Sequence, residues 1–459
     1  MQKIFLYNTA TRIKEEFKPI REGEVGIYSC GPTVYSSPHI GNMYAYVCWD
    51  ILVRTFRYLG YRVNWVMNIT DVGHLTSDAD SGEDKMEKGS KKEGLSVWEI
   101  AKKYQNEFEE NLNSLNIQHP DVLCKATDNI KEQIDLIKKI EANGFTYRIS
   151  DGIYFDTKKY IDYGKFANLN LEKIKDGARV EVNEEKKSPT DFALWKFSPS
   201  KDSGQIRQME WESPWGVGFP GWHIECTAMS VKYLGETFDI HTGGEDHINI
   251  HHTNEIAQGF GAFGKMTANF WIHNAFITFK GSKISKSSGG LYTIKDLLEM
   301  GFDPLVYKYL VIGSHYKKGM EFSIESLISA RTALEKLRSY QTDMVGEIDE
   351  AYKIEFINKI SDNLATPEVL ALVWKMMKSD LKPENKWATL LDFDKVLGLN
   401  LLKKEDLDVP KEILKLVEDR KIARSEKKWI ESDRLRREIE EKGYLVEDLQ
   451  NSCRIRKIK

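Results

Sequence analysis

The sequence predicts an α/β protein in which a parallel sheet is split by an inserted α+β subdomain and followed by an all-α C-terminal region. Short apolar runs alternate with helix-like segments over residues 1–115 and again over residues 211–290, as in a parallel sheet. Residues 116–210 differ, with short segments, mixed charge and few long apolar runs. From residue 291 onward, apolar side chains recur at helical spacing.

Composition limits the class of protein. A chain of 459 residues exceeds one hydrophobic core, so we expect two to four domains. The net charge is −4, so a nucleic-acid partner has to be held by local basic patches. No apolar run approaches the roughly 20 residues of a membrane helix. Five scattered cysteines without a C-x-x-C pair, and an N-terminus without a signal-peptide pattern, predict reduced thiols and a cytoplasmic protein.

The first half of the sheet is organised around residues 30–42. An apolar strand at residues 25–28 precedes this stretch, and a helix is predicted over residues 43–56. A strand, a Gly/Pro/Ser turn and a helix start form the arrangement in which α/β sheets bind phosphate, because the free N–H groups and dipole of the helix attract anions. The stretch also carries a thiol at Cys30 and an imidazole at His39, which a plain nucleotide loop does not need.

The remaining elements follow in order. A strand at residues 61–67 ends in Asn-Ile-Thr-Asp at residues 68–71, at the edge where parallel sheets place ligand contacts. We interpret residues 73–94 as a solvated loop and residues 97–115 as an amphipathic helix. Further segments are expected to be strands at 152–155, 192–195, 237–241 and 271–279, and helices that begin near 222 and span 251–259.

The first chemical motif is His39-Ile40-Gly41-Asn42. The small Gly41 allows a planar base or ribose to approach the backbone, and His39 can donate to phosphate oxygens as charge builds on them. On its own, such a motif is better explained as a hydrogen-bonded core histidine. A second motif, 240 residues later, changes the interpretation.

That second motif is the loop at residues 280–290, Lys-Gly-Ser-Lys-Ile-Ser-Lys-Ser-Ser-Gly-Gly, which supplies Lys283, Ser285, Lys286 and Ser287. Two cations on a Gly/Ser-rich loop suit a leaving pyrophosphate, although a lone K-x-S-K-S loop is usually plain surface. The pair of motifs resembles the HIGH and KMSKS signatures of class I aminoacyl-tRNA synthetases, with Asn42 for the second His and Ile for Met. The resemblance implies a Rossmann-like nucleotide-binding domain.

A third group of side chains is able to bind a metal. Cys30 ends one strand, Cys226 lies near a helix start, and His251 and Glu255 are four residues apart on one helix face. Two thiolates, an imidazole and a carboxylate can form a tetrahedral zinc site. The residues alone leave two alternatives open, namely buried cysteines that act as small hydrophobes and a helical His/Glu surface pair.

Five longer motifs together resemble the cysteinyl-tRNA synthetase family, from the N-terminus to the basic tail. They are Cys-Gly-Pro-Thr-Val-Tyr (30–35), Asn-Ile-Thr-Asp (68–71), Asp-Phe-Ala-Leu-Trp-Lys (191–196), Pro-Gly-Trp-His-Ile-Glu-Cys (220–226) and His-His-Thr-Asn-Glu-Ile-Ala-Gln (251–258). The polar segment 73–94 and His247 fit the family pattern less well, and we assign them no role.

The resemblance implies the roles of individual residues. One Zn²⁺ per chain would be bound by Cys30, Cys226, His251 and Glu255. It would also bind the substrate thiolate, whereas a serine hydroxyl stays protonated and is a poor ligand. Cysteine would contact Gly31, Thr70, Trp222 and Asp246. ATP, with Mg²⁺ on its phosphates, would contact His39, Gly41, Asn42, Lys283, Ser285, Lys286 and Ser287, of which His39, Asn42, Lys283 and Lys286 would be catalytic.

The expected domains follow from the pattern along the chain together with this resemblance. They are the first half of the catalytic domain (1–115), the inserted connective subdomain (116–210), the second half (211–290), a connecting, stem-contact-like helical segment (291–345), a helical bundle (346–402) and a basic anticodon-binding module (403–459). Residues 411–459 hold 15 Lys and Arg against 11 Asp and Glu. On charge alone this tail is better explained as a solvated helical hairpin, and the anticodon role rests on the resemblance.

The predicted activity is ATP-dependent activation of L-cysteine to cysteinyl-adenylate, followed by transfer to the terminal adenosine of cysteine tRNA. We expect a cytoplasmic monomer without a membrane partner. One alternative is a ligase that passes the same adenylate to a small amine. Relatives of that kind lack an anticodon-binding end, so the long basic C-terminus here counts against it. The other alternative is a non-catalytic tRNA- or zinc-binding paralogue, against which the complete set of motif residues argues.

Overall fold

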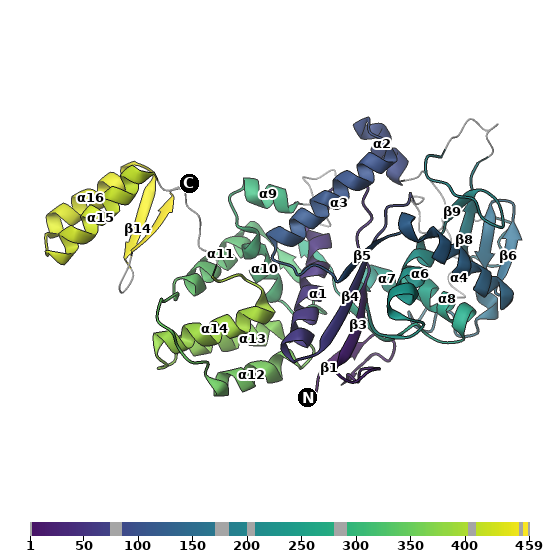
Figure 1. Cartoon of the computed structure of the whole chain (residues 1–459), viewed down its shortest axis with the longest axis horizontal. Helices are drawn as coiled ribbons and strands as arrows, with labels where there is room; N and C mark the ends of the chain where they lie inside the picture. Colours follow the sequence, from purple (N-terminus) through teal and green to yellow (C-terminus); the bar gives the residue numbers. More distant parts are fainter. Residues whose placement is uncertain are drawn as a thin grey trace. The chain divides into compact units, whose positions relative to one another are not determined.

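A computed structural model describes residues 2–73, 85–169, 183–199, 207–279, 292–402, 410–448 and 453–457. The chain divides into two compact units, which are drawn in Figure 1 and described separately below. The first contains Met1–Leu334 and Thr342–Asn400, and the second contains Glu335–Gln341 and Leu401–Lys459. Within the described ranges, every helix is too short or too polar to cross a membrane.

The centre of the first unit is a five-stranded parallel sheet with strand order β11-β10-β3-β4-β5. The strands are β3 (Glu24–Ser29), β4 (Arg62–Ile69), β5 (Val122–Lys125), β10 (Phe238–Gly244) and β11 (Ala268–Asn274). Strands β3 and β10 come from opposite sides of the insertion but are direct neighbours, with Ile240 opposite Ile27. The prediction of a split parallel sheet is therefore confirmed.

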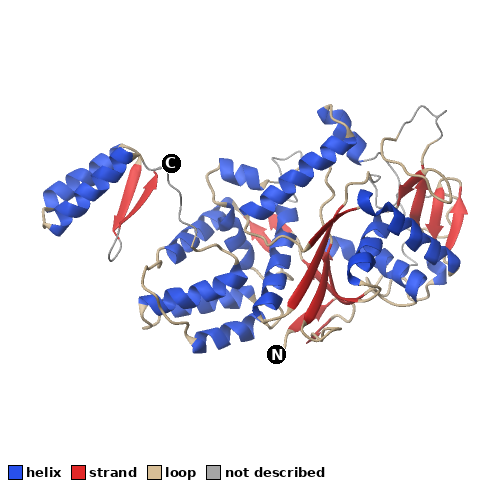
Figure 2. Ribbon diagram, viewed as in Figure 1, coloured by secondary structure: helices blue, strands red, loops and turns tan. Residues whose placement is uncertain are grey.

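Helices cover both faces of this sheet, and Figures 1 and 2 show α1 (Ile40–Tyr58) and α6 (Trp222–Leu234) on opposite sides of the strands. Helix α1 begins three residues earlier than the apolar spacing predicted. The side chain of His39 accepts from the backbone N–H of Asn42, and the Asn42 side chain accepts from the backbone N–H of His39. This capping box satisfies free N–H groups at the helix start and fixes where the helix begins.

The insertion contains a small antiparallel sheet with order β6-β7-β8-β9. Its strands are β6 (Thr146–Ile149), β7 (Gly152–Phe155), β8 (Phe192–Phe197) and β9 (Gly218–Pro220). Helices α3 (Val97–Ser114) and α4 (Ile130–Ala142) precede it in the chain, and α6 follows. The hydroxyl of Tyr163 donates to Asn254 Oδ1, which ties the insertion to helix α8 (Thr253–Phe263).

The remainder of the first unit is mainly helical, as predicted. Its helices are α9 (Ile294–Glu299), α10 (Pro304–Ile312), α11 (Ile324–Arg338), α12 (Glu350–Ile360), α13 (Thr366–Met377) and α14 (Pro383–Leu397), of which α11 continues into the second unit. Strand β12 (Ile277–Phe279) pairs in parallel with β13 (Met320–Phe322), and β1 (Phe5–Asn8) pairs antiparallel with β2 (Ile13–Glu16).

A buried group of charges, the Asp50 cluster (Asp50, Arg54 and Lys308), joins α1 to α10. Oxygen Oδ2 of Asp50 lies 2.8 Å from Arg54 Nε and 2.7 Å from Lys308 Nζ. The second carboxylate oxygen accepts from the backbone N–H of Gln118, and both cations also donate to the carbonyl of Asn116. Asp50 and Lys308 are wholly buried, so each charge depends on these partners in place of water. The cluster therefore links the two helices.

The second unit is a helical hairpin of α15 (Lys411–Ser425) and α16 (Trp429–Glu441) with a β-hairpin of β14 (Tyr444–Asp448) and β15 (Cys453–Lys457). The β-hairpin was not predicted, because its alternating pattern is short and highly charged. A small core of Ile413, Val417, Ile439, Tyr444 and Val446 packs the helices against the strand. Such a core is small for a free-standing domain.

Three other local predictions need correction. The segment 73–94, predicted as a loop, contains helix α2 (Lys85–Glu93), in which Met86 is fully buried. The strand predicted at 271–279 is two strands, β11 and β12, which belong to different sheets. The helix predicted at 251–259 starts within a π-helical turn, Ile248–His252, and the regular α-helix, α8, begins only at Thr253. The finer domain boundaries remain predictions.

Candidate metal and substrate site

Four side chains gather at the carboxyl edge of the central sheet. Cys30 directly follows β3, and its backbone N–H donates to the carbonyl of Thr242 on the neighbouring β10. Cys226 lies on α6, His251 lies in the π-helical turn and Glu255 lies in α8. The residues Cys30, Cys226, His251 and Glu255 are all buried, and we call them the thiol cluster.

The spacing inside the thiol cluster suits a tetrahedral metal ion. One ligand atom from each residue lies within 4.8 Å of every other. The two sulfur atoms are 4.0 Å apart, and His251 Nε2 lies 3.2 Å from Glu255 Oε1. Zinc–sulfur and zinc–nitrogen bond lengths in a tetrahedron give ligand-to-ligand edges of about 3.3–3.8 Å. The observed distances are close to these values without any rearrangement of the chain.

The π-helical turn explains how two adjacent histidines reach this one site. In a regular α-helix, neighbouring residues point about 100° apart. Widening the turn at Ile248–His252 lets His251 face Glu255 while His252 Nε2 lies 3.3 Å from Cys30 Sγ. Such π-turns are frequent at functional sites. The sequence pattern contained no signal for it.

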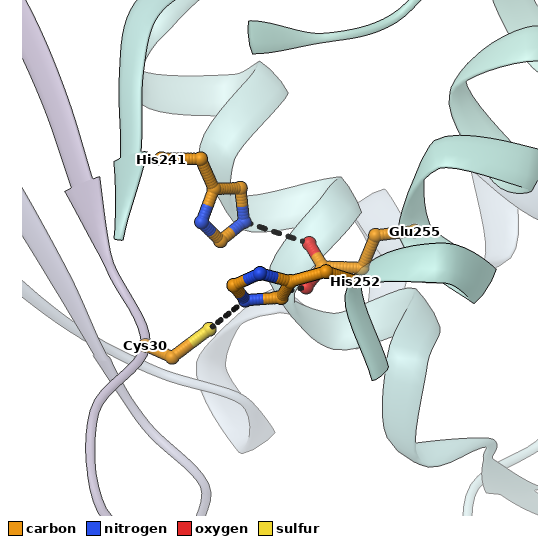
Figure 3. A group of neighbouring side chains, drawn as sticks. All are labelled: Cys30, His241, His252 and Glu255. Carbon is orange, nitrogen blue, oxygen red and sulfur yellow. Dashed lines mark hydrogen bonds and ion pairs between the residues drawn. The ribbon is translucent and has the colours of Figure 1, made fainter. Parts of the chain in front are cut away.

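Further histidines surround the thiol cluster, and no sequence pattern indicated a role for them. His241 Nε2 lies 3.0 Å from Glu255 Oε2, and His223 Nδ1 lies 3.0 Å from His251 Nδ1. Figure 3 shows the side chains of Cys30, His241, His252 and Glu255 pointing toward one another. Hydrogen bonds of this kind fix the ring and carboxylate orientation of metal ligands.

These neighbours also form a second group that could hold a cation. Cys30, His241, His252 and Glu255 again offer four ligand atoms within 4.8 Å of one another. Two of the four belong to the thiol cluster as well, so the two groups share one space. His252 Nδ1 is hydrogen-bonded to His273 Nε2 at 2.7 Å, and His273 Nδ1 to Thr9 Oγ1 at 2.8 Å. This chain of contacts fixes the ring of His252.

Burial dominates the electrostatics of the cluster. Burial, the hydrogen bond to Cys226 and the nearby acidic groups raise the pKa of Cys30 well above its usual value. The hydrogen bond from Cys30 lowers the pKa of Cys226, but burial and the neighbouring carboxylates outweigh it, so the pKa of Cys226 is raised above its usual value. Burial also lowers the pKa of His252 far below the usual histidine value. Each group is thus neutral unless a cation compensates the thiolate charge.

The donor set fits a zinc ion. Glu255 Oε1 is buried and has no hydrogen-bond donor among the described residues, although His251 Nε2 lies next to it. An unpaired buried carboxylate oxygen is costly, and a cation between these atoms removes the cost. Two sulfurs, one imidazole and one carboxylate are ligands that zinc accepts in a four-coordinate site.

Residues predicted to contact cysteine lie around this cluster. Gly31 N–H donates to Asn68 Oδ1, and a side chain at Gly31 would collide with the Asn68 carbonyl. Thr70 is buried and bonded to Glu225 Oε2 at 3.2 Å. The ring of Trp222 lies 4.9 Å from that of His251. Asp246 is 61% exposed, so of these predicted contacts its carboxylate is the one that faces solvent.

The predicted nucleotide residues lie at the start of α1. His39 and Asn42 hydrogen-bond to each other in the capping box, with the asparagine at the position where the family signature has a histidine. The backbone N–H of Ile40 donates to the carbonyl of Tyr292 at 2.8 Å. The loop with Lys283, Ser285, Lys286 and Ser287 lies outside the described residues. Its C-terminal flank at Tyr292 therefore meets the first signature directly.

Comparisons with known proteins agree along almost the whole chain. Residues 16–332 match the family described as class I (C) tRNA synthetases, catalytic domain. The chain is 47% identical to Cysteine–tRNA ligase 1 of Burkholderia lata, over 98% of this chain and 96% of the relative. It is 42% identical to the cysteine–tRNA ligase of Treponema denticola, over 96% and 97%.

Solved structures extend the comparison to the fold. A methionyl-tRNA synthetase of Mycobacterium tuberculosis in complex with methionyl-adenylate matches with a TM-score of 0.54 and 15% identity, over 83% of this chain and 91% of the other. A second structure of that enzyme, bound by methionyl-adenylate, gives a TM-score of 0.56 and 14% identity over 83% and 93%. At such identity the likeness concerns the fold alone.

Proposed function

The chain belongs to the cysteine–tRNA ligase family of class I tRNA synthetases, and on this basis we propose that its thiol cluster holds a zinc ion through which it selects cysteine. The enzyme is an aminoacyl-tRNA ligase that joins cysteine to tRNA. The observation that carries the zinc proposal is the convergence of four buried ligand atoms within 4.8 Å at the sheet edge.

Selection at this cluster rests on the chemistry of sulfur. A bound zinc ion would ligate the substrate thiolate and lower its pKa, whereas a serine hydroxyl would stay protonated and bind poorly. Cys30 and Cys226 supply soft ligands, while His251 and Glu255 complete the set. A site built on one strong specific contact can discriminate well enough to need no editing domain.

The nucleotide part of the proposal rests on the two signatures. His39 and Asn42 at the start of α1, with the small Gly41 between them, would receive the ATP phosphates. Lys283 and Lys286, with Ser285 and Ser287, would stabilise the leaving pyrophosphate, and Mg²⁺ would accompany the polyphosphate. The contact of Ile40 with Tyr292 supports this pairing, because Tyr292 lies only two positions after the second signature in the sequence.

Cysteine tRNA, ATP and L-cysteine are the partners that family membership implies. We expect the second unit, with its basic tail, to bind the anticodon end, and the segment 291–345 to contact the tRNA stem. Exposed Trp429 beside Arg424 on the second unit suits contact with unpaired bases. Gly31, Thr70, Trp222 and Asp246 would surround the amino acid. A cytoplasmic monomer remains our expectation.

Exchange of pyrophosphate into ATP, measured with cysteine and with or without purified tRNA, tests this function. Cysteine should support exchange and serine should not, and adding tRNA should give cysteinyl-tRNA. Absence of cysteine-dependent exchange would refute the enzyme assignment. Exchange without tRNA charging would favour a ligase that uses a small amine. Exchange that survived complete removal of zinc would refute the metal part of the proposal alone.

A further inference from the structure

A line of hydrogen bonds runs beside the thiol cluster and links its two sulfur-bearing segments. Gly31 N–H donates to Asn68 Oδ1 at 2.8 Å, and Asn68 Nδ2 donates to Thr70 Oγ1 at 3.0 Å. Thr70 Oγ1 in turn donates to Glu225 Oε2 at 3.2 Å. Asn68, Thr70 and Glu225 are each at most 2% exposed, so water does not compete with these bonds.

The direction of each bond in this line is fixed by chemistry. A backbone N–H can only donate, so the Asn68 atom that faces Gly31 is the carbonyl oxygen and its amide group faces Thr70. A carboxylate can only accept, so the Thr70 hydroxyl proton points at Glu225. The hydroxyl oxygen has two lone pairs, and among the described residues Asn68 uses one of them. Thr70 therefore presents an acceptor to anything that binds beside it.

The position of this acceptor matches one part of the substrate. Gly31 directly follows Cys30, and Glu225 directly precedes Cys226, so the line begins and ends next to the two thiols of the cluster. In free cysteine only the Cβ and Cα atoms separate the thiol from the ammonium group. Thr70 follows β4 as Cys30 follows the neighbouring parallel strand β3, so a thiol bound at the cluster brings a triple N–H donor to the sheet edge at which Thr70 lies.

We propose that Asn68 and Glu225 are positioning residues which fix the Thr70 hydroxyl as an acceptor for the ammonium group of the bound cysteine. Glu225 acts through this hydroxyl, because its carboxylate accepts the hydroxyl proton and so makes the oxygen a stronger acceptor. The inference rests on the proposed function for the thiol site and adds recognition of the amino group. It accounts for a fully buried carboxylate that is outside the thiol cluster.

The experiment compares cysteine with 3-mercaptopropionate, which carries the thiol and carboxylate but no amino group. Dissociation constants are measured by calorimetry on zinc-loaded full-length protein. Thr70→Val should weaken cysteine about ten- to hundredfold, the size expected for a hydrogen bond to a charged group, and leave the analogue within twofold. Thr70→Ser, which keeps the hydroxyl, should bind cysteine nearly as wild type does.

Glu225→Gln tests the positioning residue. It keeps an acceptor for Thr70 but removes the charge, so cysteine should bind about tenfold more weakly and the analogue should be unaffected. Because Glu225 acts through Thr70, the double variant should be no weaker than Thr70→Val alone. In pyrophosphate exchange the loss should raise KM for cysteine much more than it lowers kcat. If the Gln variant fails to fold, Glu225→Asp takes its place in the same cycle, because its shorter side chain withdraws the carboxylate from the Thr70 hydroxyl.

The proposal is overturned if the analogue weakens as much as cysteine, or if the effects at Thr70 and Glu225 simply add. Measuring the zinc content of each variant distinguishes failure of the zinc proposal from failure of this inference. If the protein holds no zinc but the Thr70 and Glu225 effects are non-additive and specific for the amino group, the zinc proposal is refuted and this inference stands. If zinc content and cysteine selectivity are as proposed but the two effects add, this inference is refuted and the zinc proposal stands.

Discussion

Two buried polar clusters in the first unit differ in where their positive charge comes from. In the Asp50 cluster, Arg54 and Lys308 neutralise Asp50, and backbone groups at Asn116 and Gln118 complete the hydrogen bonding. In the thiol cluster, two thiols and a carboxylate lie beside histidine rings, and Glu255 Oε1 lacks a hydrogen-bond donor among the described residues.

The difference separates a structural cluster from a binding site. A cluster that stabilises the fold carries its own counter-charges, because an unpaired buried charge costs several kcal/mol. A cluster that binds a cation leaves lone pairs pointing at one another until the cation arrives. The same degree of burial therefore has opposite consequences, and the variants below test this contrast in order of expected effect.

The largest effect should come from Cys226→Ser. Removing one soft ligand should abolish zinc binding and reduce cysteine activation by at least about a thousandfold, since serine is a poor zinc ligand. Metal analysis and pyrophosphate exchange measure both losses. The matched control is Cys124→Ser, because Cys124 is an equally buried thiol whose sulfur lies 3.5 Å from the Met67 carbonyl. Retained zinc in Cys226→Ser, or lost zinc in Cys124→Ser, would contradict the distinction between a metal-binding thiol and a structural one.

Lys286→Ala removes a cation that we expect to contact the phosphates mainly in the transition state. We expect adenylate formation to slow about a hundred- to thousandfold, the usual cost of losing one transition-state contact, with cysteine affinity unchanged. Single-turnover exchange and cysteine binding measure the two quantities. The control is Lys295→Ala, an exposed lysine on α9. An equal fall in cysteine affinity would show that Lys286 acts on the ground state.

Asp50→Asn should affect stability and spare the metal. Two buried cations would lose their counter-charge, so the free energy of unfolding should fall by about 3–5 kcal/mol. Zinc content per folded molecule should not change. Asp135→Asn is the matched control, because its pair with the exposed Lys131 is solvated and contributes little to stability. Denaturant unfolding that gave equal losses at both positions would contradict the structural role of the Asp50 cluster.

Asp71 provides the smallest test, since it is a buried carboxyl that has hydrogen bonds but no direct ion pair among the described residues. Burial raises its pKa to about 6, although Thr127 donates to both of its oxygens. The folded protein therefore binds a proton more tightly than the unfolded chain, and this contribution to stability is lost as pH rises from about 4 to 6.

Asp71→Asn should remove this pH-dependent loss of stability. Between pH 4 and pH 7.5, the free energy of unfolding of the variant should rise by about 1–3 kcal/mol relative to that of the wild type. Unfolding curves across this range measure the gain. Replacing the exposed Asp128 by Asn should leave the profile as it is. A pH profile that is the same in Asp71→Asn and wild type would show that burial of this carboxyl is less complete than the structure indicates.

Only the thiol side of this contrast was predicted, and it depended on the family resemblance, because the residues alone left buried apolar cysteines and a surface His/Glu pair as alternatives. The strand before Cys30 and the helix start near Trp222 place both thiols at one edge of a parallel sheet. The spacing of His251 and Glu255 indicates one helix face. The split sheet was equally predictable, since apolar runs of the same kind occur on both sides of residues 116–210.

Other features depend on contacts that no local pattern contains. The π-helical turn at Ile248–His252 has no local sequence signal, and the partners of His241 and His273 lie on other elements, at Glu255 and His252. Lys308 lies in a helix that the pattern does predict, yet its salt bridge to Asp50 spans 258 positions. The β-hairpin of the second unit lacked the apolar alternation that would have indicated it.

The most direct test of the central claim is zinc K-edge X-ray absorption on the purified enzyme before and after adding cysteine. Without substrate, we predict two sulfur ligands at about 2.3 Å, together with nitrogen and oxygen from His251 and Glu255. Adding cysteine should raise the count to three sulfurs, and adding serine should leave it at two. A sulfur count that did not change with cysteine would contradict selection of the thiol at this cluster.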